Sequence, residues 1–135
     1  MKKVIVVLIG IIRRGNKYLL TKRIHEEKRY HDKWQLPGGE LEFGETMSEC
    51  LKRELREEIG MEATPIKLLP KILTRTDGKM HFILISYLCK LDNPDTVIQL
   101  NDEASEYGWY TYKEMQKLEQ LPQLSDIIRE AEGEI

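Results

Sequence analysis

The sequence predicts an α/β fold in which a mixed β-sheet is covered by helices. Segments rich in β-branched residues outnumber segments with helical periodicity, and the predicted helices lie between and after the strands. The chain has 135 residues, which suits one compact domain over 1–135. Its composition of 41% hydrophobic and 33% charged residues excludes a disordered chain.

Charge and hydropathy exclude two classes of partner. The 21 basic and 23 acidic residues give a net charge of −2, unlike the strongly basic domains that bind nucleic acid. The longest apolar run, 4–12, is far shorter than the roughly 20 residues of a membrane-spanning helix. We therefore expect no nucleic-acid partner and no membrane. Cys50 and Cys89 lack metal-site or redox spacing, which is typical of buried thiols in a cytoplasmic protein.

The first half of the chain predicts a hairpin and then a helix. Gly15-Asn16 is a turn signal between two strand-like segments, and the polar stretch 24–33 is typical of a loop. Thr46 and Glu49 have the spacing of a capping box, and Gly60 is a natural helix terminator. The predicted elements are strands at 4–13, 18–22 and 34–36, a turn at Pro37-Gly38-Gly39, and a helix over 46–60.

The second half predicts more strands and two closing helices. Pro65 and Pro70 indicate that the strand over 66–74 lies at an edge or bends. Asp77-Gly78 predicts a turn into a long strand. The remaining predicted elements are a strand at 80–91, a loop at 92–103, a strand at 106–111, and helices at 112–118 and 125–132.

The helix over 46–60 carries acidic residues where a core-facing helix should be apolar. On a helical wheel, Glu54 and Glu58 fall within the apolar face, and Glu57 borders it. Two carboxylates about 5 Å apart repel by roughly 3 kcal/mol at an effective dielectric near 20. Clustered hard oxygen ligands suit Mg²⁺ or Mn²⁺. The alternative is a solvated acidic face paired with basic residues, but the wheel places Arg53 and Arg56 on the far side.

The loop and helix together resemble a complete Nudix box. The segment Gly39 to Glu45, seven spacer residues, and then Arg53-Glu54-Leu55-Arg56-Glu57-Glu58-Ile59-Gly60-Met61 fill every specified position of that family's pattern. The hairpin before the box and the strands after it also fit the Nudix order. The resemblance implies a Nudix-type α/β/α sandwich with a mixed β-sheet, formed by a single Nudix domain over 1–135 with its box at 39–61.

The resemblance also implies a reaction. Nudix hydrolases cleave a nucleoside diphosphate linked to another group, with Mg²⁺ as cofactor and Mn²⁺ as its substitute. The segments 36–39 and 41–45 are similar to those of MutT-like members. We therefore expect a pyrophosphohydrolase that converts nucleoside triphosphates, including oxidised or non-standard ones, to monophosphate and pyrophosphate. ADP-ribose, sugar nucleotides and dinucleoside polyphosphates are alternative substrates, and a non-catalytic nucleotide-sensing module is a rival of another class. Many relatives are homodimers, and the sequence leaves the oligomeric state open.

By the same resemblance, box residues take metal and catalytic roles. Arg53 would orient a glutamate, and either Glu54 or Glu57 would act as general base. A further acidic ligand commonly comes from a late loop, where Glu103 is the candidate and Glu106 and Asp102 are alternatives. The full set of expected metal ligands is Gly38 through its carbonyl, Glu54, Glu57, Glu58 and Glu103.

Four residues outside the metal set are candidates for substrate contact. Arg23 ends the second predicted strand and could reach a phosphate or base. Gln35 precedes the proline-glycine turn, where related pockets bind a base, and Gly39 lies at that turn. His81 shares a strand face with Ile83 and Ile85, and this strand would line the pocket floor. The alternative for His81 is a partly buried histidine without contact to substrate.

Overall fold

Eight strands and three helices make up the fold, which a computed structural model describes over residues 1–135. Their bounds, in chain order, are β1 (Lys3–Arg14), β2 (Lys17–Arg23), β3 (Trp34–Gln35), β4 (Gly38–Glu40), α1 (Met47–Ile59), β5 (Ala63–Leu68), β6 (Leu73–Asp77), β7 (Met80–Leu91), β8 (Ala104–Tyr110), α2 (Tyr112–Met115) and α3 (Leu124–Gly133).

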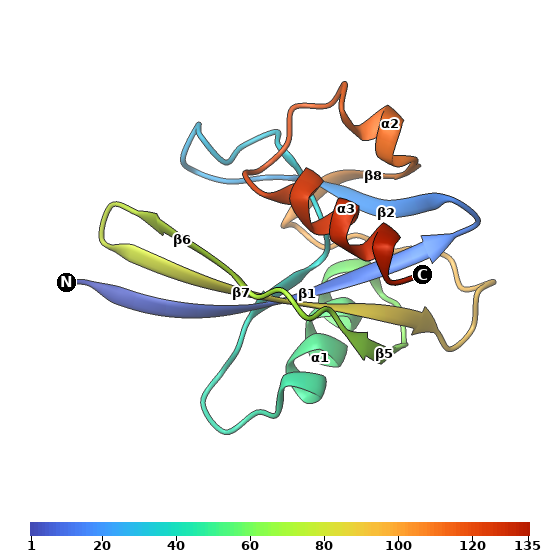
Figure 1. Cartoon of the computed structure of the whole chain (residues 1–135), viewed down its shortest axis with the longest axis horizontal. Coiled ribbons are helices and arrows are strands. Elements are labelled where there is room, and N and C mark those ends of the chain that lie inside the picture. Colours follow the sequence, from blue (N-terminus) through green and yellow to red (C-terminus); the bar gives the residue numbers. More distant parts are fainter.

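The two longest strands, β1 and β7, form the centre of the sheet (Figure 1). They run parallel, from Lys3 opposite Met80 to Ile12 opposite Cys89. The strands β5 and β6 pair antiparallel with the other edge of β7. On the free side of β1, β4 pairs with its middle, whereas β2 pairs only near Arg13 and Arg14 and then continues alongside β3 and β8. The sheet is therefore mixed, and it splays open where β2 leaves β1.

Helices cover both faces of this sheet. Along β1, Leu8 and Ile12 pack with residues of α1, whereas Ile9 and Ile11 pack with residues of α3. This alternation follows from the two-residue period of a strand, which sends neighbouring side chains to opposite faces. Figure 1 shows α1 and α3 on opposite sides of the central strands. The predicted α/β/α sandwich with a mixed sheet is confirmed.

Three expectations about local structure need correction. The strand expected over 66–74 is two strands, because β5 ends at Leu68 and β6 begins at Leu73, with Pro70 between them. Gly38 and Gly39 do not form a turn but begin the short strand β4. The helix expected over 112–118 ends at Met115. The other predicted strands and helices form within a few residues of their expected bounds.

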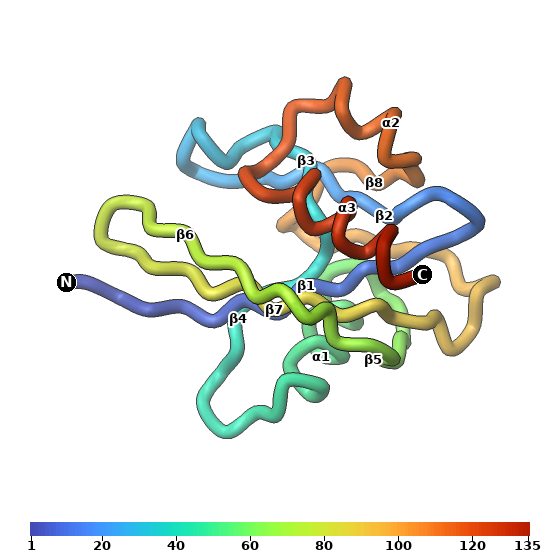
Figure 2. Tube along the Cα trace, viewed as in Figure 1, coloured from blue at the N-terminus to red at the C-terminus, as the bar shows by residue number.

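The loop 24–33 lies on the same side of the sheet as the segment between α2 and α3 (Figure 2). Backbone hydrogen bonds hold the short strand after this loop: the Trp34 N–H donates to the Glu119 carbonyl, and the Leu121 N–H donates to the Trp34 carbonyl. The Arg23 N–H and carbonyl bond to Lys33 and Asp32, which closes the base of the loop. The loop and the α2–α3 segment thereby form the wall of a space above β1 and β7.

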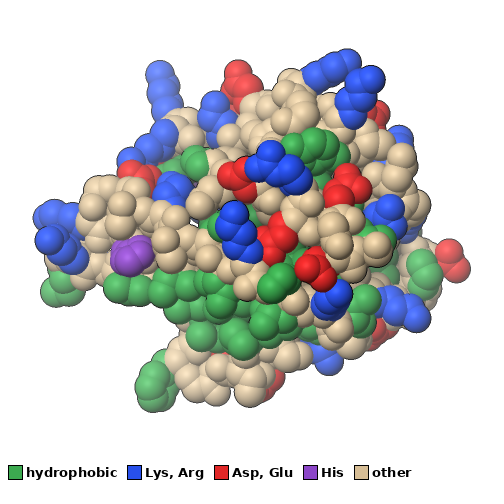
Figure 3. Space-filling view, in the orientation of Figure 1, with side chains coloured by type: hydrophobic (Ala, Val, Ile, Leu, Met, Phe, Trp, Pro, Cys, Tyr) green, Lys and Arg blue, Asp and Glu red, His purple; other side chains and the backbone are tan.

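The surface carries both signs of charge. Figure 3 shows basic and acidic side chains interspersed over one face, with apolar side chains between them. No helix in the fold has both the length and the apolar character needed to cross a membrane.

Candidate active site

Capping interactions fix the position of α1 relative to the loop before it. The Thr46 hydroxyl accepts a hydrogen bond from the Glu49 N–H, and the Glu49 carboxylate accepts one from the Thr46 N–H. At the other end Gly60 adopts a left-handed conformation with φ 66° and donates to the Arg56 carbonyl. The capping box and the glycine terminator are both confirmed. They set which residues of α1 face the sheet and which face the loop.

Three glutamates from two distant segments converge at one end of α1. Carboxylate oxygens of Glu54, Glu58 and Glu103 all lie within 4.8 Å of one another. Glu103 reaches the helix because the loop before β8 is tied at two points. Its carbonyl accepts from the Ile24 N–H at 2.9 Å, and the Asn101 N–H donates to the Glu58 carbonyl at 3.3 Å. Of the three acidic residues considered in the late loop, Glu103 is the one that joins the helix glutamates.

Glu58 is the buried member of this cluster, with only 2% of its surface exposed. The Thr21 hydroxyl donates to its Oε1 at 3.3 Å, and the Gly38 N–H donates to its Oε2 at 3.2 Å. Burial, together with the nearby carboxylates of Glu103 and Glu54, raises the pKa of Glu58 to about 7. Neither hydrogen bond supplies a positive charge, so the buried carboxylate has no ionic partner.

Arg53 organises the remaining carboxylates of the box. Its guanidinium pairs with Glu45 at 2.7 Å, with Glu54 at 2.8 Å and with Glu57 at 3.3 Å. It also donates to the Glu40 carbonyl at 3.1 Å, which links the helix to β4. The helical wheel predicts Arg53 on the far side, and the structure corrects this, because the long side chain extends back to the cluster. Arg53 is therefore placed to orient glutamates, as the resemblance implies.

The same guanidinium affects the protonation of its partners unequally. Hydrogen bonds from Arg53 lower the pKa of Glu45 to about 2. Glu54 receives a bond from the same group, yet burial dominates and raises its pKa, with the carboxylates of Glu103 and Glu57 adding to the shift. Glu45 also accepts from the Glu42 N–H at 2.9 Å, so it holds the loop as well as the arginine.

Two glycines allow β4 to lie against these carboxylates. A Cβ on Gly39 would lie 2.3 Å from the carboxyl carbon of Glu54. Gly38 has φ 149°, and a Cβ there would lie 2.0 Å from the Leu8 carbonyl oxygen. Side chains are therefore excluded at both positions, for different reasons. One position needs space for a carboxylate, and the other needs a backbone conformation that L-residues rarely adopt.

Three other acidic candidates lie outside the cluster. The Glu57 side chain is 56% exposed and turned toward Arg53. Glu106 pairs with Lys22 at 3.4 Å on the surface, and Asp102 is exposed. The structure thus separates Glu57 from Glu54 and Glu58, although all three are neighbours on the helix.

The donor set fits a hard divalent cation. Three carboxylates converge, one of them is buried without an ionic partner, and every ligand atom they offer is an oxygen. Carboxylate oxygens are the ligands preferred by Mg²⁺ and Mn²⁺, whereas no cysteine or histidine lies in the cluster to favour a softer metal. A bound cation would also relieve the repulsion between the carboxylates.

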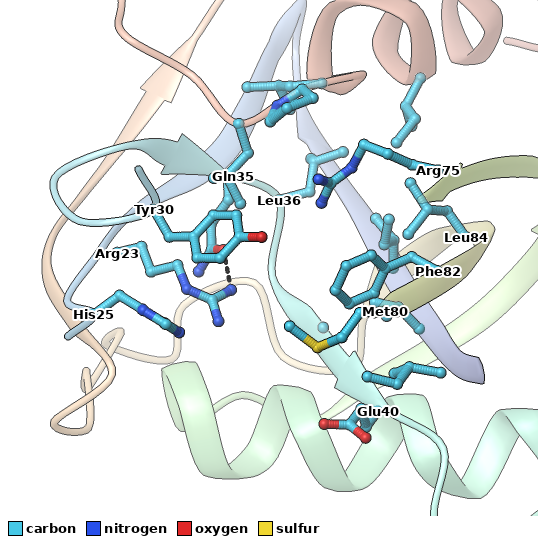
Figure 4. A pocket seen from close by; sticks show the side chains of 18 of the residues that line it. Arg23, His25, Tyr30, Gln35, Leu36, Glu40, Arg75, Met80, Phe82 and Leu84 are labelled. Atoms are coloured by element: carbon cyan, nitrogen blue, oxygen red, sulfur yellow. Dashed lines mark hydrogen bonds between the residues drawn. The ribbon is translucent and has the colours of Figure 1, made fainter. Parts of the chain in front are cut away.

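A cavity of about 270 Å³ lies beside β4 (Figure 4), and it adjoins the cluster because Gly38 both lines it and donates to Glu58. Arg23, Gln35 and Gly38 line it, and Arg23 donates to the Gln35 side-chain oxygen at 3.1 Å. Its other walls are largely apolar and come from β1, β7 and the start of α3, with Phe82 and Leu84 among them. Two of the residues expected near substrate, Arg23 and Gln35, therefore line one cavity, together with Gly38, which was expected as a metal ligand.

The strand β7 lines this cavity as expected, but His81 itself is not among the lining residues. Met80, Phe82 and Leu84 point into the cavity from β7, so the alternate residue His81 lies on the opposite face. His81 is exposed there rather than partly buried.

Sequence reasoning missed two residues of this region, Thr21 and Arg75. Thr21 is fully buried in β2 against Glu58, and Arg75 enters the cavity from β6. Thr21 could have been found from the sequence, because it is a polar residue that follows the apolar residues of its strand.

The fold and the site define the class of the protein. A carboxylate cluster at the end of α1, held against a glycine-rich strand in an α/β/α sandwich, is the arrangement that the Nudix box implies. The family model of the NUDIX domain matches residues 1–131. The chain belongs to the Nudix family and is a Nudix hydrolase.

Individual relatives agree with this assignment. The nucleoside triphosphatase NudI of Enterobacter sp. (strain 638) is 32% identical over 123 residues, which cover 84% of this chain and 86% of the relative. The nucleoside triphosphatase NudI of Escherichia coli O81 (strain ED1a) is 34% identical over 113 residues, or 76% of this chain and 79% of the relative. The crystal structure of a MutT protein from Methanosarcina mazei Go1 has a TM-score of 0.83 at 25% identity, covering 98% of this chain and 96% of that one.

Proposed function

We propose that this Nudix hydrolase acts on nucleoside triphosphates, which it cleaves with water to a nucleoside monophosphate and pyrophosphate. Relatives named nucleoside triphosphatase match most of the chain and support this substrate class. The proposal covers 1–135 as one Nudix domain in the cytoplasm, with Mg²⁺ as the cofactor and Mn²⁺ as its substitute. The two free, buried cysteines suit a reducing compartment.

One observation supports the site more than any other: Glu58 is buried, lacks an ionic partner and lies within 4.8 Å of two further carboxylates. A purely structural role would leave an uncompensated buried charge, which is costly. A site for a divalent cation accounts for the same arrangement. Glu54, Glu58 and Glu103 would hold it, with the Gly38 carbonyl and Glu57 as the further ligands that the family resemblance adds.

When bound, the cation would neutralise phosphate charge and lower the pKa of a coordinated water. The side chains of α1 position the carboxylates and accept the proton of the attacking water. Arg53 fixes the Glu54 carboxylate through a 2.8 Å ion pair and keeps Glu57 close at 3.3 Å. Either Glu54 or Glu57 accepts the proton of the attacking water. Glu54 lies inside the cluster and has a raised pKa, which favours it as the base over the exposed Glu57.

The cavity supports a mononucleotide as the substrate. Its volume of about 270 Å³ lies just below the range of about 300–1,000 Å³ for small-molecule sites, which suits one nucleoside better than two. Arg23 lies in its wall and donates to the Gln35 side-chain oxygen at 3.1 Å, so a guanidinium and an amide are available to a bound nucleotide. Dinucleoside polyphosphates would have to leave their second nucleoside outside this cavity.

A panel of substrates tests the proposal. Wild-type protein with Mg²⁺ is incubated with nucleoside triphosphates, ADP-ribose, sugar nucleotides and dinucleoside polyphosphates, and the products are resolved by chromatography. Glu54→Gln and Glu57→Gln identify the base, because loss of a general base costs about 10²- to 10⁴-fold in turnover. Glu62→Gln is the matched control, since Glu62 is exposed and pairs only with Arg56.

Cleavage of a triphosphate to monophosphate and pyrophosphate by the wild type and by Glu62→Gln supports the proposal. Cleavage of ADP-ribose or a sugar nucleotide alone would replace the substrate class. If no compound is cleaved but a nucleotide raises the melting temperature, the protein is a nucleotide sensor and the proposal is wrong.

A further inference from the structure

Arg75 occupies an unusual position in the cavity beside the carboxylate cluster. It extends from β6 into a wall formed mainly by apolar side chains, and its guanidinium carbon lies 4.9 Å from the centre of the Phe82 ring. Figure 4 shows Arg75 and Arg23 entering the cavity from opposite sides. Three quarters of the Arg75 side chain is buried, because its exposed fraction is 24%.

Arg75 forms one long ion pair and no short hydrogen bond within the protein. Its Nε is buried and forms no hydrogen bond. The nearest carboxylate, Asp77, lies 3.7 Å from Nη1, beyond hydrogen-bond distance. That carboxylate is already engaged by the Arg29 guanidinium and the Tyr30 hydroxyl. Two guanidinium groups therefore share one carboxylate, and Arg75 retains both positive charge and free N–H donors inside the cavity.

The register of the sheet places Arg75 away from the carboxylates. Arg75 pairs with Phe82, which lies opposite Ile5 of β1, whereas Gly38 lies opposite Ile9. The four steps from Ile5 to Ile9 span roughly 13 Å along the strand. The backbone of Arg75 is therefore offset along the sheet from Gly38, which donates to Glu58 of the cluster. Arg75 faces the opposite end of a substrate that extends through the cavity.

An arginine offers donors only, so its partner must be an acceptor. A phosphate is a poor partner at this end of the cavity, because it would leave water for walls that are mainly apolar. A nucleobase is a better one, since its faces are apolar and its edge carries the acceptors. A keto oxygen accepts from the guanidinium, whereas an amino group at the same ring position places donor against donor.

We propose that Arg75 selects nucleotides whose base carries a keto group, at C6 of a purine or C4 of a pyrimidine, over those with an amino group there. This inference rests on the proposed function, since it assigns the base end of the same substrate. Phe82 supports the guanidinium from one side, and Asp77 limits its movement from the other.

Two pairs of substrates isolate this choice. dITP and dATP differ at C6, and dUTP and dCTP differ at C4, in each case by keto against amino. We expect the wild type to have the higher kcat/KM for the keto member of each pair. Arg75→Met keeps the apolar stem and should lower kcat/KM for the keto members about 5- to 100-fold, while the amino members change less than about threefold. Arg75→Lys, with one donor group, should have a kcat/KM for the keto members between those of the wild type and Arg75→Met.

Arg129→Met is the matched control, because Arg129 is exposed on α3 and pairs only with Asp126. Melting curves verify that both variants fold. Equal kcat/KM for keto and amino members in the wild type, or an equal loss for all four in Arg75→Met, would overturn the role of Arg75 and leave the hydrolase intact.

A binding measurement separates this inference from the reaction. Calorimetry without metal compares dIMP with dAMP. If the wild type cleaves no triphosphate but binds dIMP more tightly than dAMP, and Arg75→Met abolishes the difference, the proposed function fails and the role of Arg75 stands. Equal affinities of the wild type for the two monophosphates would overturn the role of Arg75.

Discussion

The two glycines of β4 allow a sharp test of the site, because the same substitution should lower activity at Gly39 and stability at Gly38. Gly39→Ala places a methyl group 2.3 Å from the carboxyl carbon of Glu54, and the nearest atoms all belong to that flexible side chain. To reach ordinary contact the carboxylate must move by roughly 1 Å. A displacement of about 1 Å in a catalytic group can cost about 100-fold in rate. We expect that loss in kcat/KM.

The stability of Gly39→Ala should be nearly unchanged. No backbone atom is among the close contacts, and alanine reduces the entropy of the unfolded chain by about 0.4–1 kcal/mol. Gly38→Ala is the contrasting variant. Its φ of 149° costs an L-residue about 1–3 kcal/mol, and its Cβ would lie 2.0 Å from the backbone oxygen of Leu8. At about 3 °C per kcal/mol, the backbone conformation alone should lower the melting temperature by about 3–9 °C.

The assay combines steady-state hydrolysis with Mg²⁺, a titration of Mn²⁺ binding, and thermal melting of both variants. The expected pattern is a folded, weakly active Gly39→Ala and a destabilised Gly38→Ala. Near-wild-type turnover of Gly39→Ala would show that the position of the Glu54 carboxylate is not critical. A similar loss of melting temperature in both variants would show that backbone atoms, and not the carboxylate, absorb the clash at Gly39.

Three further predictions follow from the burial and charge of named groups. Glu58→Gln should weaken Mn²⁺ binding at least about tenfold. The melting temperature of the metal-free variant should equal or exceed that of the wild type, because the substitution removes an uncompensated buried charge. Unchanged Mn²⁺ affinity would contradict the role of Glu58 as a metal ligand. Arg53 lowers the pKa of Glu45 to about 2, so the ionised Glu45 stabilises the fold fully above about pH 4.5 and loses this effect as the pH falls toward 2. The difference in melting temperature between wild type and Glu45→Gln should therefore shrink over that pH range. A constant difference would contradict this prediction. Burial raises the pKa of Cys50 to about 11 and that of Cys89 to about 12. A thiol reagent at pH 8 should therefore modify the native protein slowly and the denatured protein fast. Rapid modification of the native protein would refute this prediction.

Much of this site could be predicted from local sequence. A helix has fixed geometry, so the spacing of Glu54 and Glu58 places them on one face whatever surrounds them. The capping box and Gly60 set the helix ends through contacts within a few residues. The family pattern added the expectation of a late acidic ligand, and Glu103 is the residue that reaches the cluster.

Tertiary structure decided the features that depend on how far a side chain extends and on which strands pair. A wheel locates the Cα of Arg53 but not the end of its long side chain, which extends to Glu54 and Glu57. The two-residue period of β7 separates His81 from Phe82, but the packing of α3, the loop 24–33 and the α2–α3 segment determines which face borders the cavity. Arg75 lies in an ordinary-looking strand, and only the strand register and the prior engagement of Asp77 leave its donors free. Local spacing therefore determined the carboxylates, whereas contacts between distant segments determined the cavity they adjoin.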